Sequence, residues 1–77
     1  MRHQLQLTVV NSVGVLNRIT AVIRKRYINV YELSTYPSTK SLHEVEISLD
    51  LLSEKQLREI MQQLNKLVEV LEVNLKE

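Results

Sequence analysis

A short segment near the start of the chain carries the residue types that could bind a small anion. The segment, Asn11-Ser12-Val13-Gly14-Val15-Leu16, joins an alternating apolar run to an amphipathic one, which predicts a turn from a strand into a helix. Gly14 is the only glycine in the chain and lies where that helix should begin. The first backbone N–H groups of a helix have no partner within it and carry positive dipole charge, so they can bind a carboxylate or a phosphate. Glycine here lets a ligand approach the backbone closely, although a turn that needs glycine only for its geometry is the alternative interpretation.

The histidines offer little for catalysis. His3 lies near the terminus, His43 falls in the apolar phase of a predicted strand, and neither has a recognisable partner motif beside it. We therefore interpret His43 as a strand-end residue rather than a general acid or base. A single glycine also cannot form the fingerprint of a dinucleotide or phosphate-binding loop. The sequence thus predicts a protein that is not an enzyme.

A metal site would need clustered ligands, and three carboxylates do share one face of a predicted strand. They are Glu44, Glu46 and Asp50. Alternating carboxylates are typical of the solvated face of an antiparallel strand, so we expect no metal site there.

Composition restricts the class of partner. The net charge is +1, whereas binding to nucleic-acid phosphates usually requires a clear basic excess. Three tyrosines without phenylalanine or tryptophan also make a poor surface for stacking bases. No run approaches the roughly 18 apolar residues of a membrane span. Because residues 1–6 are polar and no apolar run follows, we expect no signal peptide and a cytoplasmic protein.

The size of the chain favours one small domain that associates with other copies. Its 77 residues, taken as a single domain 1–77, are near the lower limit for one hydrophobic core. Without cysteine there can be no disulfide to compensate for a small core. Oligomerisation is then the most available source of additional burial.

Hydrophobic periodicity defines the first half of the fold. Residues 3–10 alternate as a half-buried strand does, and from Val15 the apolar residues recur at helical spacing as far as the basic cluster at 24–26. Residues 28–36 alternate again, with Val30 opposed to Tyr31 and Leu33, which predicts a strand with apolar side chains on both faces.

The second half repeats the pattern. The turn-rich segment 37–41 separates the second strand from an alternating run at 43–50, which predicts a hairpin. Ser53 should begin a second helix, with Gln56 completing a capping box, and residues 68–75 return to strand character.

The order of elements is therefore β-α-β-β-α-β. We expect an α+β protein of the ferredoxin-like type, in which a four-stranded antiparallel sheet carries both helices on one face. Such a sheet has two open edges, and pairing with another copy is a usual way to cover an edge. A homodimer is the expected state.

Several segments together resemble a known family, the ACT domain of the small regulatory subunit of acetolactate synthase (acetohydroxyacid synthase). The matching residues are Leu7-Thr8-Val9-Val10-Asn11, Gly14-Val15-Leu16-Asn17-Arg18-Ile19, Arg26, Asn29-Val30, Leu33, and Gln63-Leu64-Asn65-Lys66-Leu67-Val68-Glu69-Val70. The last of these segments is typical of this subunit more than of ACT domains in general. The resemblance covers nearly the whole chain.

The resemblance implies a non-catalytic regulatory subunit that binds and activates the large catalytic subunit in branched-chain amino acid biosynthesis. The thiamine diphosphate, magnesium and flavin of the holoenzyme would belong to the large subunit, and this chain would hold no cofactor. ACT domains of this family dimerise side by side and bind a branched-chain amino acid at the interface. The resemblance leaves open both valine-type feedback and a form without feedback. A stand-alone ACT-type amino-acid sensor that regulates a different enzyme is the alternative.

Mapped onto this chain, the effector site of the family comprises seven residues. They are Asn11, Val13, Gly14, Val15, Leu16, Asn29 and Val30. The backbone N–H groups of this loop could bind the effector's carboxylate, the two asparagine amides could serve both charged groups, and the aliphatic residues could contact its side chain. Asparagine is also common in turns and helix caps, which is the structural alternative for Asn11 and Asn29.

One position departs from the family pattern. The chain has Tyr27 where the family commonly has glycine after Arg26. A bulky residue is rarely found at positive φ, so we expect an altered turn at this point.

Overall fold

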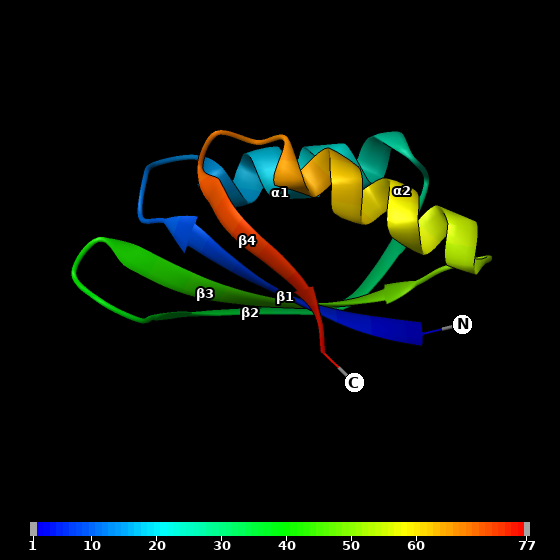
Figure 1. Ribbon diagram of the computed structural model, residues 1–77, viewed down its shortest axis with the longest axis horizontal. Coiled ribbons are helices and arrows are strands. Elements are labelled where there is room, and N and C mark those ends of the chain that lie inside the picture. Colours follow the sequence, from blue (N-terminus) through cyan, green and yellow to red (C-terminus); the bar gives the residue numbers. More distant parts are fainter. Residues whose placement is uncertain (1, 77) are drawn as a thin grey trace.

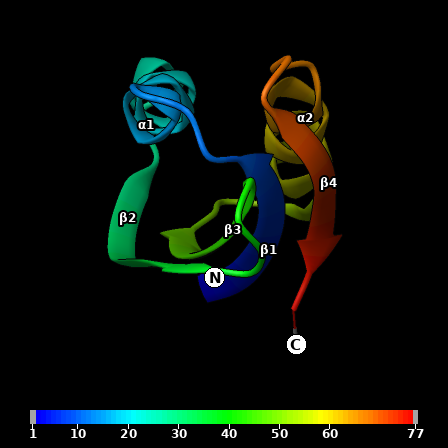
Figure 2. The same cartoon turned by 90° about the vertical axis from the view of Figure 1, so that its left-hand side faces the viewer.

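Two helices cover one face of a four-stranded antiparallel sheet in the computed structural model, which describes residues 2–76 (Figure 1). The elements in chain order are β1 (Arg2–Val10), α1 (Val15–Lys25), β2 (Asn29–Pro37), β3 (Leu42–Asp50), α2 (Glu54–Asn65) and β4 (Val70–Leu75). The strands lie in the order β2-β3-β1-β4, and each neighbouring pair is antiparallel. This arrangement confirms the predicted ferredoxin-like fold. Figure 2 shows α1 on the β2 side of the molecule and α2 on the β4 side.

The core lies between the sheet and the helices. β1 alternates strictly, with its odd-numbered residues buried, because only its helix-facing side chains are covered. Each helix packs its apolar face against this side of the sheet. The buried apolar residues are Leu5, Leu7, Val9, Val15, Ile19, Ile23, Ile28, Val45, Ile47, Leu49, Leu51, Leu57, Ile60, Leu64 and Val70.

The C-terminus of α1 retains the turn that a glycine usually makes. Tyr27 adopts a left-handed conformation, with φ of 57°. Its N–H donates to the Arg24 carbonyl at 2.9 Å, and the N–H of Ile28 donates to the Ile23 carbonyl at 3.5 Å. These two hydrogen bonds, with Ile23 and Ile28 both buried, form a Schellman motif. The expected alteration of the turn at Tyr27 was therefore wrong, because the motif holds the backbone while the tyrosine side chain stays in solvent.

The edge strand β2 contains an irregularity that the alternation did not predict. Its register with β3 shifts between Val30 and Glu32, so that Val30 pairs with Leu49 and Leu33 pairs with Ile47. Both partners belong to the helix-facing core, and Val30 and Leu33 therefore lie on the same side of the sheet. The prediction that Leu33 opposes Val30 was wrong, because a β-bulge adds one residue and reverses the phase of the rest of the strand.

The start of α2 departs from the predicted capping box in one detail. The Ser53 side chain accepts a hydrogen bond from the Gln56 N–H at 3.2 Å, as expected of an N-cap. The Gln56 side chain, however, accepts from the N–H of Leu52 at 2.7 Å rather than from that of Ser53. The second hydrogen bond of the capping box therefore involves the residue before the N-cap instead of the N-cap itself.

The face of the sheet opposite the helices is polar. Glu44 accepts hydrogen bonds from Gln6 at 2.9 Å and from Thr8 at 3.0 Å. Arg2 stacks on the Tyr31 ring, 4.0 Å from its centroid. The strand carboxylates that could suggest a metal site thus lie on this solvated face. Within residues 2–76, no helix has the length and hydropathy of a membrane span.

Candidate functional site

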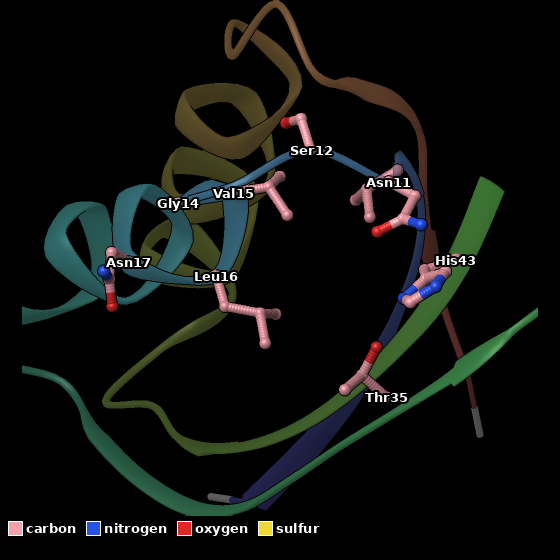
Figure 3. Close-up of a pocket in the computed structure, with 9 residues that line it drawn as sticks. Asn11, Ser12, Gly14, Val15, Leu16, Asn17, Thr35 and His43 are labelled. Carbon is pink, nitrogen blue, oxygen red and sulfur yellow. The ribbon is translucent and has the colours of Figure 1, made fainter. Parts of the chain in front are cut away.

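A cavity of about 240 Å³ opens between the start of α1 and the ends of three strands (Figure 3). It lies on the helix-facing side, where β1 leads into the Gly14 turn. Its lining combines that turn with residues of β2 and β3 that are distant in sequence. The lining residues are Val9, Asn11, Ser12, Gly14, Val15, Leu16, Asn17, Thr35 and His43.

The two sides of the cavity differ in chemistry. Figure 3 shows Val15 and Leu16 projecting from the α1 side, opposite Asn11, His43 and Thr35 on the strand side. The α1 side therefore carries two aliphatic residues together with Asn17, and the other side offers amide, imidazole and hydroxyl groups beside Val9. An apolar surface with a few convergent polar groups is the usual composition of a small-molecule site.

The Gly14 turn presents the start of α1 to this cavity. Gly14 has φ of 84° and ψ of 0°, a left-handed conformation that L side chains rarely adopt. It makes no side-chain cap, and the first turn of α1 contains no acidic residue. The positive end of the helix dipole is therefore not neutralised by a residue of that turn, which suits an anionic group of a ligand.

The structure brings four of the seven mapped residues together. Asn11, Gly14, Val15 and Leu16 all line the cavity. Val13 belongs to the same turn, but it is 99% exposed and does not line the cavity. Its position in the loop places its side chain in solvent.

The other two mapped residues lie elsewhere in the chain. Asn29 and Val30 are at the beginning of β2, whereas Thr35 of the cavity is near its end. They line a separate cavity of about 400 Å³ beside the C-terminus of α1, together with residues such as Tyr27. Within one chain the mapped site is thus divided between the two ends of the edge strand.

Four polar residues of the cavity are not among the residues predicted from the sequence: Ser12, Asn17, Thr35 and His43. The alternation of β3 could have indicated His43, because it shares the phase of the buried residues of that strand. In the structure it pairs with Val9 of β1. Thr35 had no such signal, since the bulge in β2 decides which face it occupies. The cavity therefore contains a titratable side chain that was interpreted only as a strand end.

The clearest perturbed ionisations lie outside the cavity, on the polar face of the sheet. A hydrogen bond from Lys76 lowers the pKa of Glu46, and the same bond raises the pKa of Lys76. The pKa of Tyr36 is raised by desolvation and by the nearby Glu46, which accepts a hydrogen bond from its hydroxyl at 3.3 Å. This cluster ties β2, β3 and the end of the chain together, and it does not line the cavity.

Comparison with known sequences decides the family. Residues 5–72 match the family described as "AHAS small subunit-like ACT domain". The chain belongs to this family. It is also 34% identical over 74 residues to the acetolactate synthase small subunit of Bacillus subtilis (strain 168), covering 95% of this chain and 43% of that protein.

Solved structures show the same architecture. The acetolactate synthase small subunit of Thermotoga maritima is 25% identical and superposes with a TM-score of 0.86, over 97% of this chain and 47% of that one. The ACT domain of the GTP pyrophosphokinase of Chlorobium tepidum also has a TM-score of 0.86, at 18% identity, over 99% and 97% of the two chains. The latter likeness concerns the fold alone. The chain spans less than half the length of the two small subunits it matches.

Proposed function

We propose that this ACT domain acts as a non-catalytic regulatory subunit that binds and activates the large catalytic subunit of acetolactate synthase in branched-chain amino acid biosynthesis. Membership in the small-subunit ACT family supports this role, as does the similarity to two acetolactate synthase small subunits. In this proposal, the thiamine diphosphate, magnesium and flavin of the holoenzyme reside in the large subunit. The complex works in the cytoplasm.

The cavity at the start of α1 is the proposed effector site, and a branched-chain amino acid fits its chemistry. The start of α1, whose first turn holds no acidic residue, can receive a carboxylate, while the Asn11 amide and the Thr35 hydroxyl can accept hydrogen bonds from an ammonium group. Val15 and Leu16 provide an aliphatic wall for a valine-type side chain. Effector binding here would make feedback a property of this chain.

A side-by-side dimer completes this site. β2 is an edge strand, and apart from the half-buried Leu33 its residues are exposed. If two β2 strands pair antiparallel about a two-fold axis, the beginning of one lies beside the end of the other. Asn29 and Val30 of one subunit would then approach the Thr35 end of its partner. The division of the mapped residues between the two ends of β2 is the observation that carries this proposal.

Reconstitution tests the function. The purified chain and the large subunit are mixed, complex formation is followed by size-exclusion chromatography, and acetolactate formation is measured with and without valine. We expect a complex, faster acetolactate formation, and inhibition by valine. Absence of both complex and stimulation would reject the proposal. Amino-acid binding by a chain that forms no complex would instead favour a stand-alone sensor that regulates another enzyme.

A further inference from the structure

We propose that Arg18 is the positioning residue of the Gly14 turn: it holds the turn from outside the cavity and is itself held by Glu69. This inference rests on the proposed function, because it assigns the residue that keeps the proposed effector site in its binding conformation. Arg18 does not line the cavity. It would therefore act on a ligand only through the turn.

The contacts of the guanidinium group converge on the turn. Nη2 of Arg18 donates to the Val13 carbonyl at 3.3 Å. Nη1 lies where it would be 3.2 Å from a Cβ atom at Gly14, so the side chain packs directly over that residue. Arg18 thus bonds the backbone of Val13 and lies beside Gly14, two successive residues of the turn.

Glu69 completes the clamp from another part of the fold. Its carboxylate forms an ion pair with Nη2 of Arg18. Its carbonyl accepts a hydrogen bond from the Val10 N–H at 2.8 Å, at the point where β1 ends. The α2–β4 connection therefore anchors both the end of β1 and the side chain that covers the Gly14 turn. These contacts bridge about fifty residues of sequence and depend on the tertiary fold.

Backbone hydrogen bonds also hold the two ends of the turn, from the Asn11 N–H to the Ser41 carbonyl at 2.9 Å and from the Val15 N–H to the Ser12 carbonyl at 3.3 Å. Gly14 has no side chain to form a cap, and its left-handed conformation is open to glycine without strain. The same freedom makes other conformations accessible to Gly14, so the contacts of Arg18 add to these hydrogen bonds in selecting the one observed. The forked guanidinium suits this task because it can bond a carbonyl and a carboxylate at the same time.

The test compares binding affinity, loop dynamics and stability in four variants. Arg18→Gln and Glu69→Gln each break the ion pair, Arg18→Lys retains a charge without the fork, and Arg58→Gln removes an exposed arginine of α2 as a control. Isothermal titration with valine, leucine and isoleucine gives the affinity. Amide hydrogen exchange of the ligand-free protein reports the turn through the Val15 N–H, which donates to the Ser12 carbonyl at 3.3 Å.

We expect Arg18→Gln to weaken binding about five- to tenfold, because a partly exposed charge-assisted hydrogen bond contributes modestly. Amide hydrogen exchange at Val15 should become several-fold faster, because the turn would open more often. Glu69→Gln should have a smaller effect of the same sign, and Arg18→Lys should restore part of both losses. Arg58→Gln should change neither readout.

Two outcomes would overturn the inference. Unchanged exchange at Val15 in Arg18→Gln would show that Arg18 does not hold the turn. A lower melting temperature with unchanged affinity and exchange would show a role in general stability only. If the wild type binds none of the three amino acids, the proposed effector function fails, while the exchange data still decide whether Arg18 positions the turn.

Discussion

Replacing Tyr27 by glycine should stabilise the protein. An L residue in the left-handed region costs roughly 1–2 kcal/mol, and Tyr27 has φ of 57°. Glycine removes that strain but loses about 0.5–1 kcal/mol through the greater freedom of the unfolded chain. The tyrosine side chain is 96% exposed, so its removal forfeits almost no buried surface. The centre of these ranges is a stabilisation of about 0.5–1 kcal/mol.

Thermal unfolding followed by circular dichroism measures this change. For a domain of this size, 1 kcal/mol corresponds to about 4–8 °C in melting temperature, so we expect Tyr27→Gly to melt roughly 2–8 °C higher. All variants must be compared at one protein concentration, because the melting temperature of a dimer depends on it. Tyr27→Ala is the matched control, since it removes the same side chain and keeps the strain. Its stability should stay within about 0.5 kcal/mol of the wild type.

Comparing the glycine and alanine variants distinguishes a positive from a negative φ at position 27. If the backbone at position 27 had negative φ in solution, glycine would bring only its entropic penalty and Tyr27→Gly would be the less stable protein. Tyr27→Asn should lie between alanine and glycine, because asparagine tolerates the left-handed region better than most residues do. A glycine variant no more stable than the alanine variant would refute the argument from strain.

Three further predictions concern the site, the assembly and the dependence on pH. Gly14→Asp should weaken amino-acid binding in a calorimetric titration, because its side chain would face the Arg18 guanidinium that holds the turn, 3.2 Å from Cβ, and its negative charge would lower the positive potential at the start of α1. The protein should remain folded, since Asp tolerates positive φ and the facing group is the flexible end of Arg18; equal binding by wild type and variant would move the effector site elsewhere. Sedimentation should show a homodimer at roughly tens of micromolar, and a monomer there would contradict the pairing of β2 edges. The lowered pKa of Glu46 means that its ionised form stabilises the fold above the ordinary value of 4.5 and that this contribution is lost as pH falls through the lower folded value. In Glu46→Gln, the melting temperature should therefore fall less steeply at acidic pH than it does in the wild type. The same steepness in both proteins would contradict a stabilising role of the Glu46 carboxylate.

The sequence by itself determined the elements and their order. The change from alternation in β1 to helical spacing in α1 could be recognised in the sequence. Each element buries one face, and a strand or helix buried on one face has apolar residues at the spacing of its own geometry. The same two periods located β3 and α2, and the turn-rich segment between β2 and β3 predicted their hairpin. Six elements in this order, under the rules for connecting strands, leave few arrangements. The sequence also located the Gly14 turn, since a lone glycine between a strand and a helix has few structural explanations.

The tertiary structure decided what surrounds that turn. Thr35 and His43 reach the cavity because β2, β3 and β1 lie in register, and the bulge in β2 shifts that register by one residue. A bulge depends on the partner strand as well as on local sequence, so the alternation of β2 alone could not place Leu33 or Thr35.

The contacts of Arg18 show the same limit. The helical spacing of α1 did not predict the partners of Arg18, whereas the fold places it over Gly14 and against Glu69. The separation of Asn29 from the cavity likewise follows from the length of β2, which extends the two ends of the strand in opposite directions. Short-range periodicity reports which face of an element is covered. The identity of the groups that meet there depends on chain segments far apart in sequence, which only the packed fold brings together.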